Sequence, residues 1–330
     1  MITSSKLSPH RYLLALIPPL LILGLAQGLF EITSAPSMTG VTTALERLAH
    51  QEPESLDIRV LQESRGRYAW LAMALLSLVA FVYGAIAGCQ IIWHSHFRSR
   101  LPLILSIGTA LIGIGIFGLI YQVQSEAAMY RLIFGFTFTT FSQSGLFHPQ
   151  FLSNIKFILL ALNTLAVIVP TIIILAASSA LATPQDGSPS TLDTVSTQMH
   201  QLRNTLNIGS MALVAGILHM HAWLQWPASL FQDASLQSAA SDTALAITVF
   251  WGTSFTLMLM ATYGPAAITL SAQARHILQQ EQQQGRIQDP QAWLKDHDLS
   301  ITLGEQLPQI GIMLAPVLAG PLGSLVMGSN

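Results

Sequence analysis

The sequence predicts an all-α membrane protein, a polytopic bundle of transmembrane helices. Apolar residues make up 51% of the 330 residues and charged residues only 9%, whereas soluble domains carry about 25% charged residues. A water-facing exterior with so much apolar surface would aggregate, and a lipid-facing exterior avoids that problem. Several uncharged stretches also reach the roughly 20 residues that a helix needs to cross the hydrocarbon core.

Six of these stretches predict six spans, at residues 12–30, 68–93, 101–121, 157–182, 208–231 and 243–270. The first follows a short basic segment and resembles a signal peptide. Its uncharged run continues to Phe30, long enough to span, so we expect a retained first helix. Pro18 and Pro19 should kink that helix.

Two further segments leave the span count open at six or seven. Residues 309–330 are apolar but interrupted by prolines and glycines, and they can cross, re-enter the membrane or lie at its interface. Residues 132–148 contain a phenylalanine-rich run, Phe134 to Phe141. A lone strand is excluded in lipid because its backbone would be unsatisfied. We expect an interfacial or re-entrant segment there, with an extra short span as the alternative.

The single membrane domain has two longer polar segments, and the distribution of Lys and Arg predicts their sides. With six spans, eight of these residues lie on the side of the N-terminus and six on the other. The positive-inside rule then places the N- and C-termini in the cytoplasm of a bacterial plasma (inner) membrane. Residues 31–67 become an extracytoplasmic loop and residues 271–308 a cytoplasmic tail.

Composition also excludes some classes of function. The net charge of −2 argues against nucleic-acid partners, because phosphate binding needs a concentrated basic face. A single cysteine, Cys89, cannot form an internal disulfide. No nucleophile elbow, Walker lysine or His-Glu-x-x-His sequence is present. We therefore expect a protein without catalytic residues.

Glycines in the third span form the sequence Gly-x-Gly-x-x-Gly at Gly113, Gly115 and Gly118, with Gly108 further back. A dinucleotide site needs this sequence after a strand and at the start of a helix. Here it lies inside an uncharged 21-residue run. We expect these glycines to let another helix approach closely.

Two histidines, His219 and His221, lie inside the fifth predicted span. An ionisable side chain at that depth usually faces a partner, a cavity or a cofactor. Because residues two apart on a helix point about 200° apart, the pair cannot chelate one ion. We expect His219 to be neutral and hydrogen-bonded to a neighbouring helix, with the partners to be sought among Thr253, Ser254 and Thr256. Proton handling or ligation of a metal or haem iron is the alternative.

The connection after the second span is short and basic, with His94, His96, Arg98 and Arg100. At a cytoplasmic interface its cations would contact anionic lipid headgroups. Docking of an anionic protein partner is the alternative.

Taken together, the sequence favours a non-enzymatic sensor, effector or accessory subunit in the lipid bilayer. We expect it to contact a membrane or cytoplasmic protein through residues 31–67 and 271–308, and a homo-oligomer is a further option. A channel or transporter is the alternative, with a hydroxyl-lined path along Thr248, Gly252 and Thr256. A haem-bearing electron carrier that uses His219 is the third hypothesis.

Overall fold

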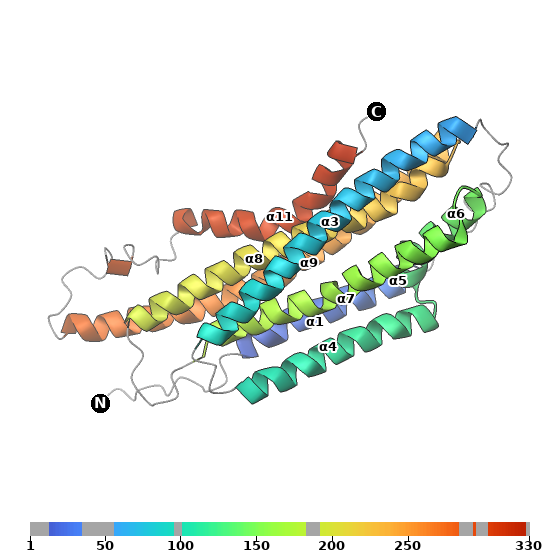
Figure 1. The fold of residues 1–330 in the computed structure, drawn as a ribbon. Coiled ribbons are helices and arrows are strands. Elements are labelled where there is room, and N and C mark those ends of the chain that lie inside the picture. The colour runs from blue at the N-terminus through green and yellow to red at the C-terminus, as the bar shows by residue number, and fades with distance from the viewer. Residues whose placement is uncertain are drawn as a thin grey trace.

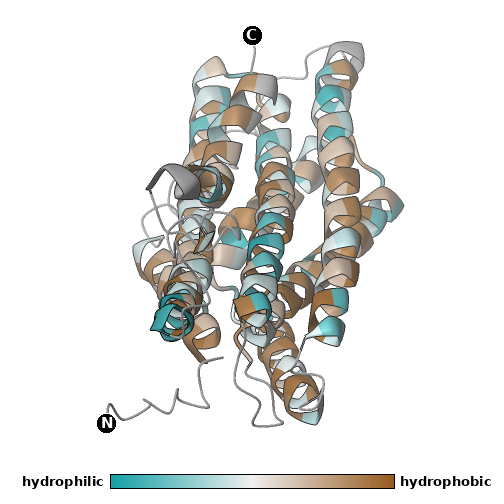
Figure 2. Ribbon diagram, turned by 90° about the vertical axis from the view of Figure 1, so that its left-hand side faces the viewer, coloured by the Kyte–Doolittle hydropathy of each residue, from teal (hydrophilic) through white to brown (hydrophobic). Residues whose placement is uncertain are grey.

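The computed structural model describes residues 13–34, 56–95, 101–182, 192–283, 293–294 and 303–327. All regular elements within these ranges are helices, and seven of them are long and apolar enough to cross a membrane. The predicted all-α membrane bundle is therefore confirmed, with one helix added to the six expected spans. The hydrophobic colouring along these helices in Figure 2 agrees with that assignment.

Figure 1 shows the long helices running side by side. They are α1 (Leu13–Thr33), α3 (Leu56–His94), α4 (Leu101–Gln124), α7 (Pro149–Ala180), α8 (Leu192–Gln225), α9 (Ala234–Gln283) and α11 (Leu303–Met327). The short elements are α5 (Ala128–Tyr130), the π-helical turn η2 (Arg131–Gly135), α6 (Phe136–Ser144) and the 3₁₀ turn η3 (Trp226–Leu230). A helix satisfies its own backbone hydrogen bonds, which is why long uncharged segments adopt this form in lipid.

Helix α8 is the central helix of the bundle and packs against α3, α7, α9 and α11. Its C-terminal part lies beside the N-terminal parts of α3 and α9, so both of these helices run antiparallel to it (Figure 1). We call this end of the bundle the tryptophan end, because Trp70, Trp223 and Trp226 meet there. The opposite end is the stalk end, where α8 begins and α9 finishes.

The connection between α4 and α7 does not cross the bundle. Gly108 lies against Leu175 and Gly115 against Val167, so α4 and α7 are antiparallel neighbours. The end of α4 and the start of α7 are therefore on the same side, at the tryptophan end. The alternative in which residues 132–148 form an extra span is wrong, because α5, η2 and α6 turn back within this end.

Helix α11 resolves the C-terminal segment as a seventh candidate span, over Leu307–Leu325. It lies against α8 and α9, in one helix, without re-entering. Crossing by all seven candidate spans would place the end of α11 on the opposite side from the N-terminus. The expectation that both termini share one side follows from six spans, and it stays a prediction.

The two longer polar segments are partly continuations of the spanning helices. Helix α3 begins at Leu56, so the second part of the expected loop 31–67 is helical. Helix α9 continues without a break to Gln283, well into the expected tail 271–308. Residues 35–55 and most of 284–302 lie outside the described ranges.

A carboxylate joins the first helix to the turn after α4. The Glu31 carboxylate accepts hydrogen bonds from the backbone N–H groups of Ala128 and Met129, at 2.9 and 3.2 Å. The first N–H groups of a helix have no acceptor within the helix, so Glu31 serves as a cap from a distant segment. This contact holds the end of α1 at the tryptophan end.

Candidate functional site

Three buried tryptophans form the centre of the tryptophan end. The rings of Trp70 and Trp226 are stacked with centroids 5.3 Å apart, and Trp223 contacts both, at 5.6 and 6.1 Å. Phe141 packs on Trp226 with centroids 4.5 Å apart. Aromatic pairs at these separations contribute about 0.5–1.5 kcal/mol each beyond their buried area. The cluster thus joins α3, α6, α8 and η3.

Each indole N–H of this cluster donates to a different partner. Trp70 donates to His219 Nε2 at 3.0 Å, Trp223 to the carbonyl oxygen of Ile133 at 2.7 Å, and Trp226 to a Glu63 carboxylate oxygen at 3.1 Å. A buried indole N–H without an acceptor would be destabilising. These three directional bonds therefore fix how the surrounding helices are rotated relative to one another.

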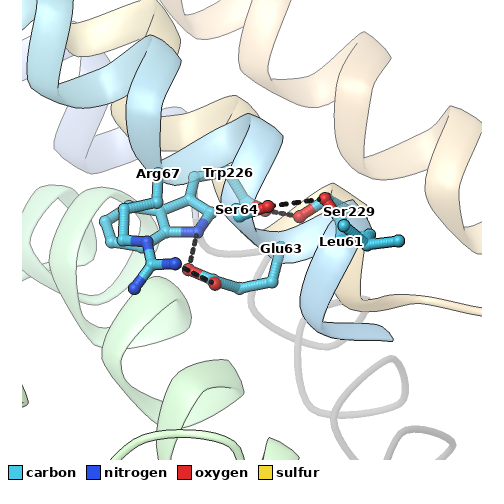
Figure 3. Close-up of polar contacts among 6 residues, drawn as sticks. All are labelled: Leu61, Glu63, Ser64, Arg67, Trp226 and Ser229. Atoms are coloured by element: carbon cyan, nitrogen blue, oxygen red, sulfur yellow. Dashed lines mark hydrogen bonds and ion pairs between the residues drawn. The ribbon is translucent and has the colours of Figure 1, made fainter. Parts of the chain in front are cut away.

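Glu63 and Arg67 form an ion pair beside the cluster, shown in Figure 3. One terminal guanidinium nitrogen of Arg67 lies 3.4 Å from Glu63 Oε2, and the Glu63 side chain is only 5% exposed. The guanidinium also lies over the rings of Tyr68 and Phe151, at 5.4 and 5.8 Å from their centroids. The carboxylate therefore has both a cation and the Trp226 N–H as partners.

Sequence reasoning assigned Glu63 and Arg67 to an extracytoplasmic loop and missed their role. The signal available was the spacing of four residues, which brings opposite charges together on a helix. Nothing in that spacing indicates that Trp226, far along the chain, completes the arrangement.

A cavity of about 270 Å³ with polar and apolar lining lies next to Trp226, at the rim of the bundle. We call it the rim cavity. Its lining residues come from α3, α8, η3 and α9: Gln62, Arg65, Gly66, Ala69, Met73, Ala222, Gln225, Trp226, Ala228, Ser229 and Gln237. Its size is close to the lower limit of small-molecule sites, roughly 300–1,000 Å³.

Gly66 lets α3 lie close to η3 beside this cavity. A Cβ at this position would lie 2.7 Å from Trp226 Cδ1 and 3.3 Å from Ser229 Oγ. The absence of a side chain therefore sets the spacing between α3 and η3. Ser229 donates to the carbonyl oxygen of Trp226 at 2.7 Å, which stabilises the turn that carries both residues.

The two histidines of the fifth predicted span face different helices. His219 faces α3, and its acceptor nitrogen is occupied by Trp70. The expectation that His219 is hydrogen-bonded to Thr253, Ser254 or Thr256 on α9 is therefore wrong. Because an indole N–H can only donate, Nε2 carries the lone pair and the neutral imidazole is protonated on Nδ1. Ligation of an iron atom through Nε2 would first require this bond to break.

His221 is 1% exposed and lies between α8, α9 and α11. Its Nδ1 is 3.4 Å from Thr248 Oγ1, and within the described part of the chain its Nε2 has no hydrogen-bond partner. A Cβ on Gly323 would lie 3.0 Å from the imidazole ring. The described residues include no group of three His, Cys, Asp or Glu side chains that could hold a metal ion.

Helix α11 covers the face of α9 on which a hydroxyl-lined path was considered. A Cβ on Gly252 would lie 2.6 Å from the carbonyl oxygen of Pro316, and Gly320 lies against Thr248. Pro316 has no N–H, which leaves the carbonyl of Ile312 without its helical partner. Ser210 of α8 donates to this carbonyl at 2.6 Å. The proline break thus anchors α11 to α8.

The four glycines of α4 fall into two groups. A Cβ on Gly115 would lie 2.4 Å from Val167, and one on Gly108 would lie 3.1 Å from Leu175, so both face α7. A Cβ on Gly113 or Gly118 would meet no atom within 4 Å. Close packing of another helix on these two positions stays a prediction.

Of the four basic residues of this connection, His94 alone falls within the described ranges. His94 is exposed, and its Nδ1 lies 2.8 Å from the carbonyl oxygen of Gln90. His96, Arg98 and Arg100 lie outside the described residues. The contact of this connection with lipid or a protein partner therefore stays a prediction.

The function is inferred from the geometry of the tryptophan end and the rim cavity, because no similar protein indicates one. No protein-family model matches the sequence, and no curated protein or solved structure matches it either.

Proposed function

We propose that this chain is a non-enzymatic transmembrane sensor of a bacterial inner membrane. In this proposal, occupancy of the rim cavity on one side of the membrane displaces a helical stalk on the other side. The stalk comprises residues 192–200 of α8 and 270–283 of α9. The observation that carries the proposal is that the same two continuous helices border the cavity and form the stalk.

The length of these helices supports transmission across the membrane. Helix α9 has 50 residues and α8 has 34. At 1.5 Å per residue α9 is about 75 Å long, more than twice the roughly 30 Å of the hydrocarbon core. A displacement of α9 at the cavity would therefore be carried to residues beyond the far side of the core.

The stalk has the polarity of a water-exposed helix pair. Val195 and Met199 of α8 are buried in one apolar cluster with Leu270 and Ala274 of α9. The outward positions are polar and exposed: Asp193, Thr197 and His200 on α8, and Arg275, His276 and Gln279 on α9. A polar helical surface next to the membrane is suited to contact a cytoplasmic protein partner.

The proposed orientation places the stalk in the cytoplasm and the rim cavity outside. Gln232, just before α9, and Gln282, near its end, are both exposed and provide a matched pair. In a Cys89→Ser background, an impermeant maleimide should label Gln232→Cys in intact cells and label Gln282→Cys only after lysis. Labelling of Gln282→Cys in intact cells would reverse the orientation.

The sensor function is tested without knowledge of the ligand by filling the cavity. Ala69 lines it, whereas Ala72, one turn away on α3, is exposed on the outer surface. Ala69→Phe should change hydrogen–deuterium exchange of stalk amides, because a bulky side chain pushes α8 and η3 away from α3, and α9 packs on both of them. Ala72→Phe should leave the stalk unchanged. Equal stalk exchange in both variants and the wild type would refute the sensor proposal.

A further inference from the structure

A second cavity lies inside the bundle, between α3, α7, α8 and α9, and we call it the central cavity. It leaves about 20 Å³ in which the centre of a water-sized molecule can move. Fifteen residues line it, and all of them except Pro170 are buried. None of the fifteen lines the rim cavity, so the two cavities are separate sites.

The walls of the central cavity are almost entirely apolar. The hydroxyl hydrogens of its two threonines are engaged, because Thr205 donates to the carbonyl oxygen of Gln201 and Thr262 to that of Met258, both at 2.8 Å. Tyr263, the third lining residue with a hydroxyl, also interacts within the chain. A buried water molecule needs about two to four polar partners, and an ion loses even more on entering an apolar site. The central cavity therefore excludes water, polar molecules and ions.

The same walls attract a guest that is apolar and polarisable. Phe81 and Tyr263 contribute aromatic rings, and Met258 contributes a thioether, whose sulfur is easily polarised. Atoms that line an unfilled space lack contacts on one side, so a guest that fills the space restores their dispersion attraction. The gain for each pair of atoms is small, but a guest surrounded by the lining makes many such contacts.

Short side chains create this space, and a proline lies where it is nearest to the outside of the bundle. Ala177 of α7 and Ala212 of α8 contribute only a methyl group each to the lining. Pro170 of α7 is the one lining residue that is partly exposed, so the cavity comes nearest to the surrounding lipid there. Since proline has no N–H, α7 lacks a backbone hydrogen bond at this point. The helix is therefore easier to deform beside the cavity than elsewhere.

We infer that the central cavity binds a compact apolar molecule of the size of a dissolved gas. Dioxygen belongs to this class. Apolar molecules prefer the hydrocarbon core to water, so the bilayer supplies such a ligand beside Pro170. The inference goes beyond the proposed sensor function and does not depend on it. The terminal methyl group of an alkyl chain has the same chemistry and is the second source that the experiment must distinguish.

Xenon is the probe, because it is compact, apolar and polarisable. The full-length protein, purified in detergent with ¹³C-labelled isoleucine and leucine methyl groups, is titrated with xenon under pressure, and the methyl chemical shifts are recorded by NMR. The methyl signals of Ile173 and Leu206, which line the cavity, should shift and then saturate. Those of Ile217, fully buried on α8 but not in the lining, should stay unchanged. No saturable shift at Ile173 and Leu206, or an equal one at Ile217, would overturn the assignment.

Variants locate the guest. Ala177→Val should weaken xenon binding about tenfold or more, because the larger side chain occupies the space that the guest needs. Ala161→Val, at an exposed position of the same helix, is the control, and its xenon affinity should stay within about twofold of the wild type. Ala212→Val fills the cavity from α8 and takes the place of Ala177→Val if that variant loses the methyl spectrum of the folded protein. Unchanged binding in a folded filling variant, or an equal loss in the control, would overturn the site.

Two further measurements keep the alternatives apart. Nuclear Overhauser effects between the methyl groups of Ile173 or Leu206 and the terminal methyl group of the detergent would show that an alkyl chain fills the cavity, and the assignment to a free molecule would fail. Ala69 lines the rim cavity and not the central cavity. Saturable xenon binding, together with stalk exchange unaffected by Ala69→Phe, would uphold the central site while refuting the sensor. The converse result would uphold the sensor and refute the central site.

Discussion

At the tryptophan end, three indole N–H bonds and stacked rings hold α3, α8, η3 and the turn after α4 together. At the stalk end, Gln198 of α8 donates to the Ala182 carbonyl oxygen after α7 at 2.7 Å, but α8 and α9 meet each other along an apolar seam that includes Val195, Met199 and Ala274. Hydrogen bonds are directional and fix rotation, whereas apolar contact is roughly proportional to area and has no preferred direction. The tryptophan end should therefore resist deformation, and the stalk should accommodate small shifts of one helix past the other.

The largest effect is expected at the tryptophan end. Trp226→Ala should reduce the free energy of unfolding by about 3–5 kcal/mol, since it removes a fully buried ring and leaves a cavity. Denaturant unfolding in detergent measures this loss. Trp93→Ala is the control, because Trp93 is 51% exposed. Similar losses in the two variants would contradict a special role for the tryptophan end.

Removal of one directional bond should have the next largest effect. His219→Leu leaves the Trp70 N–H without its acceptor, at a cost of about 1–3 kcal/mol. In a Trp70→Phe background the same substitution should cost less, because the donor is already gone. His221→Leu should differ from His219→Leu, since its Nε2 has no partner in the described structure. Identical melting temperatures for both leucine variants and the wild type would show that neither contact stabilises the fold.

The glycines of α4 provide a comparison away from both ends. Gly115→Leu should cost about 1–3 kcal/mol, because the new side chain would overlap Val167. Gly113→Leu, on the same helix, meets no atom within 4 Å and should leave thermal stability unchanged. If the two variants have the same melting temperature, α4 is not packed on α7 as described.

The smallest effect is expected on the outer surface of the stalk. Thr197→Ala, at an exposed position of α8, should change the free energy of unfolding by less than about 0.5 kcal/mol. The same unfolding assay applies. A loss comparable to that of His219→Leu would mean that directional contacts also hold the outer surface of the stalk.

The sequence predicted the first six spans, because uncharged runs of sufficient length have few alternatives to a spanning helix in a membrane. It did not predict which residues meet between helices. The spans are apolar on all sides, so no hydrophobic face indicates their rotation. His219 was paired with hydroxyls on α9, whereas its partner Trp70 is 149 residues away on α3.

The rim cavity could not be predicted for a related reason. Its residues come from four elements, and seven of the eleven are glutamines, alanines or a serine, which indicate no site when considered alone. Glu63 was assigned to a loop because acidic residues rarely lie within a span. The helix starts earlier than the apolar run, and its first turns are stabilised by packing on η3. That contact becomes visible only when Gly66 and Trp226 are brought together.

The central claim is that a change in the rim cavity moves the stalk, and the distance between two spin labels there tests it most directly. Labels at Thr197→Cys and Gln280→Cys, in a Cys89→Ser background, report on α8 and α9 at exposed positions. Electron–electron double resonance should show a shifted distance distribution when Ala69→Phe is added. Addition of Ala72→Phe should leave the distribution as in the wild type. Superimposable distributions in all three proteins would contradict transmission along α8 and α9.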